Sequence, residues 1–408
     1  MTTARHDIVV FGATSFVGQI LCRYLVEQTR TGATLDWALA GRSKAKLEAL
    51  RASLGPDAAT LPLIVADAAD EAALGELCAS TRVVISTVGP YALYGEPLVK
   101  ACAESGCDYC DLSGEVQWIR RMIERHEAAA KASGARIVHC CGFDSIPSDL
   151  GLHFLQQQAR QQFGQPCTRV KMRVKLRGGL SGGTAASLLN VIKEASADPQ
   201  LRKELANPYS LCPAGDAANV RQPNVSGIGY DPEFDAWVAP FVMAAINTRI
   251  VHRSNALSQH AYGRDFRYDE GLLTGRGFKG RAASLGMVAG IAGLMAASAL
   301  PPARWALERF VLPAPGEGPS PEAQREGFFD LRFLGKTADG RSLRTRVTGD
   351  SDPGYGSTAK MLGQAGLCLA NDIAKTERAG GFWTPATVFG DRLIARLQAN
   401  AGLRFEIM

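Results

Sequence analysis

Hydrophobic and polar positions follow two periods near the start of the chain, and together they predict a strand, a turn and a helix. Residues 8–11 form an unbroken apolar run, which is typical of a strand covered on both faces of a parallel sheet. Apolar side chains then recur at helical spacing from Val17 to Leu25. A glycine-containing turn joins the two segments.

The alternation continues through the first third of the chain. Further strands are expected at residues 37–40, 61–65, 83–85, 108–111 and 135–140, with helices between them that include one from about Pro97 to Gly106. Such repeated alternation is typical of an α/β fold with a Rossmann-type doubly wound parallel sheet. We place this domain at residues 1–147.

The pattern changes after residue 147. Residues 169–176 and 241–251 alternate as antiparallel strands with one wet face do, and residues 328–334 and 342–348 predict a β-hairpin. We therefore expect a second, α+β domain at 148–350, concerned with substrate or interactions. Residues 351–408 are expected to form helices at 356–375 and 385–397 that pack back on the first domain.

Two segments of the second domain have alternative interpretations. The sequence Ser181-Gly182-Gly183-Thr184 opens a helix that either binds an anion or packs closely through its glycines. Residues 284–300 carry no charge and contain a GxxxG pair. We expect a buried helix or a homodimer contact there first, and a peripheral membrane contact second. An integral span is disfavoured because polar sequence resumes on both sides.

Composition narrows the classes of protein. The 408 residues are 46% hydrophobic, and 45 basic against 40 acidic side chains give a net charge of +5 without a concentrated basic run, so no nucleic-acid partner is expected. The first residues lack a signal peptide, which favours a cytoplasmic protein. Cys107 and Cys110 have CxxC spacing without a second pair, so we interpret the cysteines as buried hydrophobic residues and expect no metal site.

The turn after the first strand predicts a dinucleotide site. A glycine at its start lets the chain turn, a glycine at its end lets the helix pack closely, and the helix N-terminus faces a pyrophosphate. The turn is a variant of the GxGxxG fingerprint, because Thr14 and Ser15 stand where the middle glycine would come. The expected cofactor-binding residues of the turn are Gly12, Thr14, Ser15, Phe16, Val17 and Gly18.

The end of the second strand indicates which cofactor is bound. The acidic residue that NAD sites use for the ribose is missing, and Gly41, Arg42 and Ser43 stand there instead. A guanidinium and a hydroxyl suit a 2′-phosphate, so NADP(H) is expected. Arg42 as a solvated loop cation is the alternative. Asp67, after the third strand, either borders the adenine or caps its own loop.

The loop after the fourth strand is expected beside the nicotinamide. Val88, Gly89 and Pro90 are small or compact enough for close approach of the cofactor. Three side chains near the ends of strands are candidate proton donors: Tyr91, Tyr94 and Asp144. The competing interpretation is that the tyrosines pack the domain interface and Asp144 caps the following helix.

Several stretches resemble the saccharopine-dehydrogenase-like oxidoreductases, and more closely their trans-acting enoyl reductase subgroup. The matching motifs are GATSFVG at 12–18, AGR at 40–42, STVGPY at 86–91, CDLSGE at 110–115, CGFDSIPSD at 141–149, SGGTAAS at 181–187, INTRIVHRSNAL at 246–257, GYGSTAKML at 354–362 and TPATVFGDRL at 384–393. The resemblance implies an NADP-binding Rossmann domain and a variable second domain often tied to membranes or lipid.

These observations lead to an NADPH-dependent oxidoreductase that reduces an enoyl or related unsaturated group of an acyl, polyketide or lipid-like substrate. One alternative is a non-catalytic NADP-binding sensor or scaffold at a membrane or partner surface. The other is a saccharopine-type amino-acid dehydrogenase, which needs a basic pocket for carboxylates. Its candidate ligands are Arg173, Arg177, Arg249 and Arg253.

Overall fold

The chain folds into two compact units, each assembled from two stretches of sequence. The first comprises Met1–Asp144 and Gly354–Gly402, and the second comprises Ser145–Pro353 and Leu403–Met408. The computed structural model describes residues 5–32, 35–178, 187, 190–191, 193–195, 197–216, 220–299, 302, 305 and 318–408. The expected helix opening at Ser181–Thr184 lies outside these residues.

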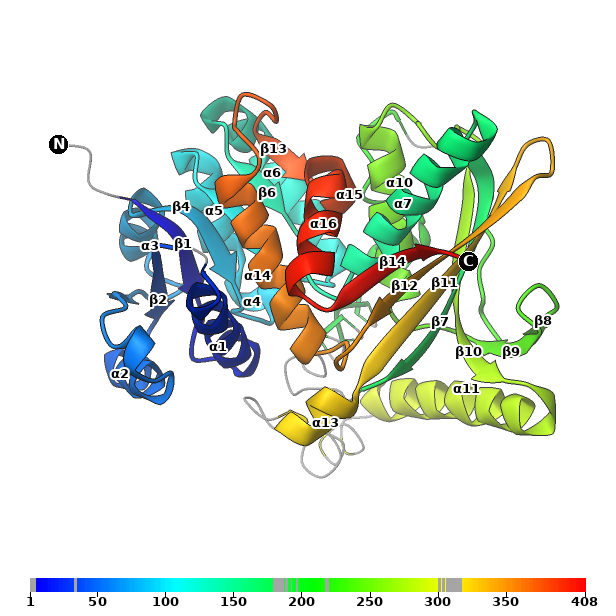
Figure 1. Ribbon diagram of the computed structural model, residues 1–408, viewed down its shortest axis with the longest axis horizontal. Coiled ribbons are helices and arrows are strands. Elements are labelled where there is room, and N and C mark those ends of the chain that lie inside the picture. The colour runs from blue at the N-terminus through cyan, green and yellow to red at the C-terminus, as the bar shows by residue number, and fades with distance from the viewer. Residues whose placement is uncertain are drawn as a thin grey trace. The chain divides into compact units, whose positions relative to one another are not determined.

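The first unit is built on a seven-stranded sheet in which every pairing is parallel, in the order β13-β6-β5-β4-β1-β2-β3 (Figure 1). The strands are β1 (His6–Phe11), β2 (Trp37–Gly41), β3 (Leu63–Val65), β4 (Thr81–Ser86), β5 (Asp108–Asp111), β6 (Arg136–Val138) and β13 (Gly381–Trp383). The order reverses between β1 and β4, which is where doubly wound sheets bind ligands. The expected fold class is confirmed.

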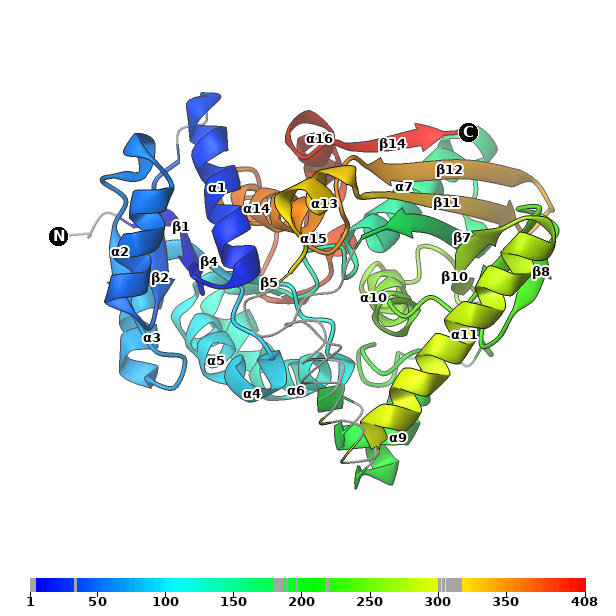
Figure 2. The same cartoon turned by 90° about the horizontal axis from the view of Figure 1, so that it is seen from below.

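Helices cover both faces of this sheet. They are α1 (Phe16–Arg30), α2 (Lys44–Ser53), α3 (Glu71–Ala79), α4 (Tyr91–Tyr94), α5 (Glu96–Ser105), α6 (Val116–Ser133), α14 (Gly356–Asn371), α15 (Pro385–Val388) and α16 (Gly390–Asn400), with a short 3-10 turn at Pro56–Ala58. Helix α14 packs beside α1 and on β1, β4 and β5 (Figure 2). Gly366 permits this approach, since a Cβ there would lie 2.4 Å from Ile85 Cδ1.

The C-terminal part of the first unit differs from the predicted helices in its details. The helix expected at 356–375 ends at Asn371. The one expected at 385–397 is divided into α15 and α16 near Gly390, whose φ of +51° interrupts a regular helix. Strand β13 was not predicted, because its three residues, GFW, are too short to show a period.

The second unit is built on a mixed sheet with the order β14-β12-β11-β7-β10-β9-β8. Its strands are β7 (Cys167–Arg177), β8 (Gly229–Asp231), β9 (Ala236–Ala239), β10 (Arg267–Gly275), β11 (Phe328–Thr337), β12 (Ser342–Gly349) and β14 (Leu403–Ile407). The β11–β12 hairpin confirms the prediction from residues 328–348. Strand β10 runs parallel to β7, whereas the other pairings are antiparallel.

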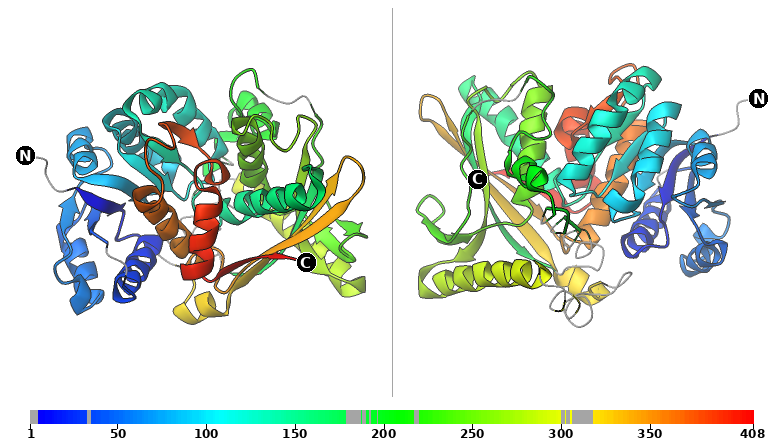
Figure 3. Two further views of the ribbon diagram at one scale, coloured as in Figure 1. Left: turned by 45° about the horizontal axis from the view of Figure 1, so that its top comes forward. Right: turned by 180° about the vertical axis from the view of Figure 1, so that it is seen from behind.

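Strand β14 completes this sheet with the last residues of the chain. Figure 3 shows the red terminal strand beside the orange hairpin, and its register pairs Phe405 with Val347. Sequence reasoning expected helices alone in this region. The pairing was missed because the partner of β14 lies about 60 residues earlier in the sequence, so no local turn signal marks the pair.

The helices of the second unit include one that corrects a predicted strand. They are α7 (Ile146–Phe163), α9 (Pro199–Ala206), α10 (Ala244–Leu257), α11 (Gly277–Ala299) and α13 (Pro321–Glu326). The prediction of a strand at 241–251 was wrong, because α10 covers most of it. Ile246, Ile250 and Val251 are buried there at helical spacing, which a short window confused with alternation.

Helix α11 corrects the first expectation for residues 284–300. A buried helix was expected, yet only 11% of the apolar window is buried within the structure. The helix contacts β9 and β10, which Figure 1 shows beside it. Arg281 lies 5.5 Å from the centroid of the Trp237 ring, and Ser284 Oγ lies 2.6 Å from Thr274 Oγ1. Leu300 lies outside the described residues.

Candidate cofactor and catalytic site

The turn between β1 and α1 requires glycine at both ends. Gly12 has a φ of +85°, and a Cβ there would lie 2.7 Å from Val88 Cγ2. A Cβ on Gly18 would lie 2.3 Å from the carbonyl oxygen of Gly12. The first glycine therefore allows the turn, and the second lets the first turn of α1 lie against the loop.

Ser15, which stands near the place of the middle glycine of the fingerprint, is the N-cap of α1. Its Oγ accepts a hydrogen bond from Gly18 N at 2.9 Å, and it lies 2.9 Å from Thr87 Oγ1. Thr87 in turn donates to the carbonyl oxygen of Gly12 at 2.9 Å. The loop after β4 and the glycine turn are thus joined by hydroxyl contacts at the switch point of the sheet.

The start of α1 presents hydrogen-bond donors suited to an anion. The backbone N–H groups of Thr14, Phe16 and Val17 make no hydrogen bond with any residue described in the structure. Such groups, with the positive end of the helix dipole, form the pyrophosphate site of dinucleotide-binding folds. Phe16 also packs edge-on against the ring of Tyr355 at 5.1 Å. The turn therefore fits the diphosphate of a dinucleotide.

The loop after β2 carries an exposed cation beside this turn. Gly41 would place a Cβ 3.9 Å from Thr14 Oγ1, so the two loops are neighbours. Arg42 is exposed and forms no ion pair with a described residue. Ser43 caps α2 by accepting a bond from Lys46 N. Arg42 is therefore available to a ligand, while the Ser43 hydroxyl also has a structural task.

Asp67 has the contacts of a loop-capping residue. Its Oδ1 accepts a hydrogen bond from Ala69 N at 3.0 Å, and its carbonyl oxygen accepts one from Asp70 N. The side chain is exposed at the end of β3. The capping interpretation accounts for these contacts, and a contact with adenine stays a prediction.

The loop after β4 is held from below by an acidic residue. Val88 is half-buried, Gly89 is exposed, and the Gly89–Pro90 peptide bond is cis. The two carboxylate oxygens of Glu115 accept hydrogen bonds from Tyr91 N and from the following amide, each at 2.9 Å. This bidentate contact fixes the backbone of the loop that was predicted to approach the nicotinamide.

The two candidate tyrosines differ in their surroundings. The Tyr91 hydroxyl is buried, donates to Ser86 O at 3.0 Å and accepts from Leu112 N at 3.2 Å. Burial raises its pKa well above the ordinary value. Tyr94 is 50% exposed. Tyr91 thus serves as a structural link between two loops, whereas the Tyr94 hydroxyl is open to solvent.

Asp144 has the acid–base property that a proton donor needs. It is half-buried and ends the first stretch of the first unit, and it lies four residues after Cys140, whose φ is +62°. Burial raises the pKa of its carboxyl to about 7, and the charge of Asp111 adds to the effect. Gly142 leaves room for it, since a Cβ there would lie 2.8 Å from Asp144 Oδ2.

A buried polar network beneath these loops was missed by sequence reasoning. Asp111 Oδ2 lies 2.7 Å from His139 Nδ1 and accepts from Tyr109 OH at 3.0 Å, while Oδ1 accepts from Ser113 N at 3.0 Å. Together with Glu115, these residues explain the polar positions of the CDLSGE motif. A signal was present, because Asp111 ends strand β5 and the polar residues Ser113 and Glu115 follow it at alternate positions.

Nine of the ten cysteines are buried and Cys212 is half-buried, and their grouping in space differs from their spacing in sequence. Cys107 lies with Cys78 and Cys102, and the three sulfur atoms are within 4.8 Å of one another. The Sγ atoms of Cys78 and Cys102 are 3.6 Å apart. Cys110 is also buried. The CxxC spacing therefore does not form a pair, and tertiary packing brings Cys107 to residues on two helices instead.

The four arginines considered for an amino-acid substrate already have partners. Arg173 pairs with Asp231 and Asp269, and Arg177 pairs with Glu326. Arg249 and Arg253 donate to the carbonyl oxygens of Leu205 and Leu211, respectively. The basic pocket that a saccharopine-type dehydrogenase would require is not formed by this set.

Known proteins match the chain over nearly its whole length. Residues 8–138 match the family model described as the saccharopine dehydrogenase NADP binding domain. The trans-acting enoyl reductase of Mycobacterium tuberculosis is 40% identical over 407 residues, covering 96% of this chain and 95% of that protein. That of Mycobacterium ulcerans is 40% identical over 412 residues, covering 97% of each.

The chain belongs to the trans-acting enoyl reductase family. It is accordingly an oxidoreductase whose first unit carries an NADP(H)-binding domain. The glycine turn, the free amides of α1 and the exposed Arg42 all lie within the matched domain.

Solved structures agree on the fold. Saccharopine dehydrogenase (L-Glu forming) from Saccharomyces cerevisiae has a TM-score of 0.54 at 12% identity, covering 99% of this chain and all of that one. The homospermidine synthase of Legionella pneumophila has a TM-score of 0.51 at 9% identity, covering 99% of this chain and 91% of that one. At these identities the likeness concerns architecture alone.

Proposed function

We propose that the protein is an NADPH-dependent reductase of an enoyl or related unsaturated group on an acyl, polyketide or lipid-like substrate. The observation that carries the proposal is an acid beyond the carboxyl end of a strand: Asp144 combines a pKa of about 7 with a position in the segment that follows β6. Carboxyl ends of parallel strands are where doubly wound sheets place their chemistry.

The chain's own residues have separable tasks in this reaction. NADPH supplies the hydride when it is bound. The amides of α1 would hold its diphosphate, Arg42 would pair with the 2′-phosphate, and Glu115 would keep the Val88–Pro90 loop in place. Asp144 in its protonated form would deliver a proton to the carbon next to the thioester or carbonyl as the double bond is reduced.

The experiment follows NADPH absorbance with 2-enoyl thioesters of increasing chain length, using the matching saturated thioesters as blanks. We expect oxidation of NADPH that depends on the double bond. Asp144→Asn should keep NADPH affinity and lose turnover about 10²-fold or more. NADPH binding without oxidation by any enoyl substrate would contradict the proposal and favour the sensor or scaffold hypothesis.

We further propose that α11 contacts a membrane surface from the cytoplasmic side. Among the described residues, Gly277–Ser298 is the one helix long and apolar enough, by length and composition, to cross a membrane, with a mean hydropathy of 1.3. Phe278, Leu285 and Met295 are 85%, 51% and 55% exposed. Lys279 and Arg281 supply positive charge at one end, which suits anionic headgroups.

Flotation with vesicles containing anionic lipid tests this contact. We expect the wild-type protein to float and the double variant Leu285→Asp, Met295→Asp to stay in the dense fraction. The control is Ala45→Asp, which adds a negative charge at an exposed position of α2, outside α11. If the wild type fails to float and sediments as a dimer that the double variant dissociates, the helix is a homodimer contact instead.

A further inference from the structure

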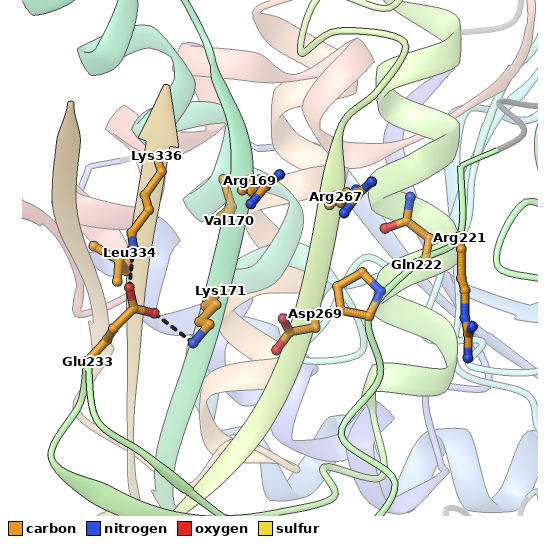
Figure 4. Close-up of a pocket in the computed structure, with 11 residues that line it drawn as sticks. Arg169, Val170, Lys171, Arg221, Gln222, Glu233, Arg267, Asp269, Leu334 and Lys336 are labelled. Atoms are coloured by element: carbon orange, nitrogen blue, oxygen red, sulfur yellow. Dashed lines mark ion pairs between the residues drawn. The ribbon is translucent and has the colours of Figure 1, made fainter. Parts of the chain in front are cut away.

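A pocket of about 630 Å³ opens on one face of the second unit's sheet, over β7, β10 and β11 (Figure 4). Side chains alternate between the two faces of a strand, and the opposite face is covered by α7. There, a Cβ on Gly151 would lie 2.6 Å from Phe333 Cζ. The pocket therefore belongs to the face that α7 leaves open, where five cationic and two acidic side chains line it.

Both acidic side chains of the pocket are already paired. Glu233 binds Lys171, with Nζ and Oε2 2.6 Å apart, and it also pairs with Lys336 (Figure 4). Asp269 pairs with Arg173 Nη1 at 2.5 Å. Asp231 pairs with Lys171 and Arg173 in the same cluster. The two lysines and Arg173 are thus balanced by three carboxylates.

Three arginines remain as the excess positive charge. Arg169, Arg221 and Arg267 line the pocket, and none forms an ion pair or side-chain hydrogen bond with a residue in the described parts of the chain. All three are exposed. Figure 4 shows Arg169 on β7 and Arg267 on the adjacent strand β10, with Arg221 on the segment beyond.

The strand register places these cations directly opposite one another. Arg169 is the cross-strand partner of Arg267 on one side and of Lys336 on the other. Like charges directly opposite in a sheet are destabilising. The pocket therefore has an unfavourable charge arrangement that a bound anion would relieve.

The segment that carries Arg221 is fixed to the sheet by its neighbour. Gln222 Nε2 donates to Phe266 O at 2.9 Å and to Tyr209 OH at 2.6 Å, and Gln222 Oε1 accepts from Tyr268 N at 3.0 Å. These contacts place Arg221 beside β10 at little further entropic cost when a ligand binds.

We propose that this pocket binds a phosphate monoester group. Guanidinium groups match phosphate oxygens with paired hydrogen bonds. Three guanidinium charges also suit a phosphate monoester, which carries about two negative charges, better than a ligand with a single carboxylate. The volume leaves space for an organic moiety attached to the phosphate. The proposal is independent of the cofactor site, because all of its residues lie in the second unit.

Calorimetric titration with phenyl phosphate tests the site. We expect saturable binding that weakens roughly tenfold or more in each of Arg169→Gln, Arg221→Gln and Arg267→Gln. Arg325→Gln is the matched control, since Arg325 is an exposed arginine on α13 outside the pocket. No saturable binding, an equal loss in the control, or equally tight binding of the dicarboxylate glutarate would overturn the proposal.

A second readout separates the site from a structural role. Arg169→Gln removes a like-charge contact, so its thermal unfolding midpoint without ligand should equal or exceed that of the wild type. A clear decrease would contradict the charge argument. Vesicles that contain phosphatidic acid identify the source of the phosphate group. If they displace phenyl phosphate, the ligand is a lipid headgroup, and if they do not, it is a soluble monoester. Either result supports a site for a phosphate monoester.

Discussion

His139 Nδ1 lies 2.7 Å from Asp111 Oδ2, and both side chains are buried beneath the loops that follow β4, β5 and β6. The same carboxylate accepts hydrogen bonds from Tyr109 OH, Ser113 N and Cys140 N. A buried carboxylate that accepts this many hydrogen bonds fixes the surrounding backbone and side chains. The loops of the proposed active site thus lie on a buried polar network.

Asp111→Asn is expected to destabilise the protein by about 2–4 kcal/mol, because an amide cannot accept all of these bonds and leaves buried donors unpaired. Urea denaturation followed by circular dichroism measures the change. Asp57→Asn is the control: its pair with Arg30 is exposed and should contribute less than about 1 kcal/mol. Equal effects of the two substitutions would contradict the importance of the network.

Arg42→Ala is expected to raise the dissociation constant for NADPH about tenfold or more while leaving that for NADH unchanged, because only NADPH carries the 2′-phosphate. Nucleotide fluorescence titration gives both constants. Arg23→Ala, an exposed arginine on α1, controls for the general loss of charge. If Arg42→Ala weakens both nucleotides alike, Arg42 does not read the 2′-phosphate.

Gly18→Ala is expected to lower the free energy of unfolding by about 1–3 kcal/mol and to weaken NADPH binding, since the new Cβ would lie 2.3 Å from Gly12 O. The matched substitution is Gly75→Ala in α3, where nothing lies within 4 Å. That change should be neutral or stabilising by up to about 1 kcal/mol. Thermal unfolding with and without NADPH compares the two variants, and tolerance of alanine at Gly18 would refute the tight packing of the turn.

The raised carboxyl pKa of Asp144 sets the expected direction in which the rate of enoyl reduction changes with pH. Because burial raises its carboxyl pKa to about 7, the proton is present below that pH and lost above it. Enoyl reduction should therefore slow as the pH rises through about 7, and Asp144→Asn should remove this ionisation from the pH profile of kcat/KM. Tyr94→Phe tests the competing proton donor. If Tyr94→Phe loses turnover while Asp144→Asn keeps wild-type turnover, Tyr94 is the proton donor.

Arg136→Ala should destabilise the first unit by about 3–5 kcal/mol, because it leaves the carboxylate of Asp108 buried without its bidentate partner. The guanidinium also donates to Leu369 O and Ile373 O, which joins β6 to the end of α14. Denaturant unfolding measures the loss. Arg120→Ala, whose pair with Glu124 is exposed, should change stability little.

The sequence by itself determined the nucleotide-binding half, because its information is local. The unbroken apolar run before Gly12, the helical spacing after Gly18 and the missing acid near Arg42 are all readable within short windows. Parallel strands buried on both faces give strong apolar runs, and glycine turns have steric requirements that few other residues meet.

Only the tertiary structure decided which distant groups meet. Asp111 and His139 are 28 residues apart, Cys107 joins Cys78 and Cys102 rather than Cys110, and neither relationship follows from a local period. The pKa of Asp144 depends on burial, and the row of cations around Arg169 depends on strand register. Strand β14 pairs with a hairpin far earlier in the chain. Burial, register and long-range pairing arise from the packing of the whole chain, and sequence windows do not contain them.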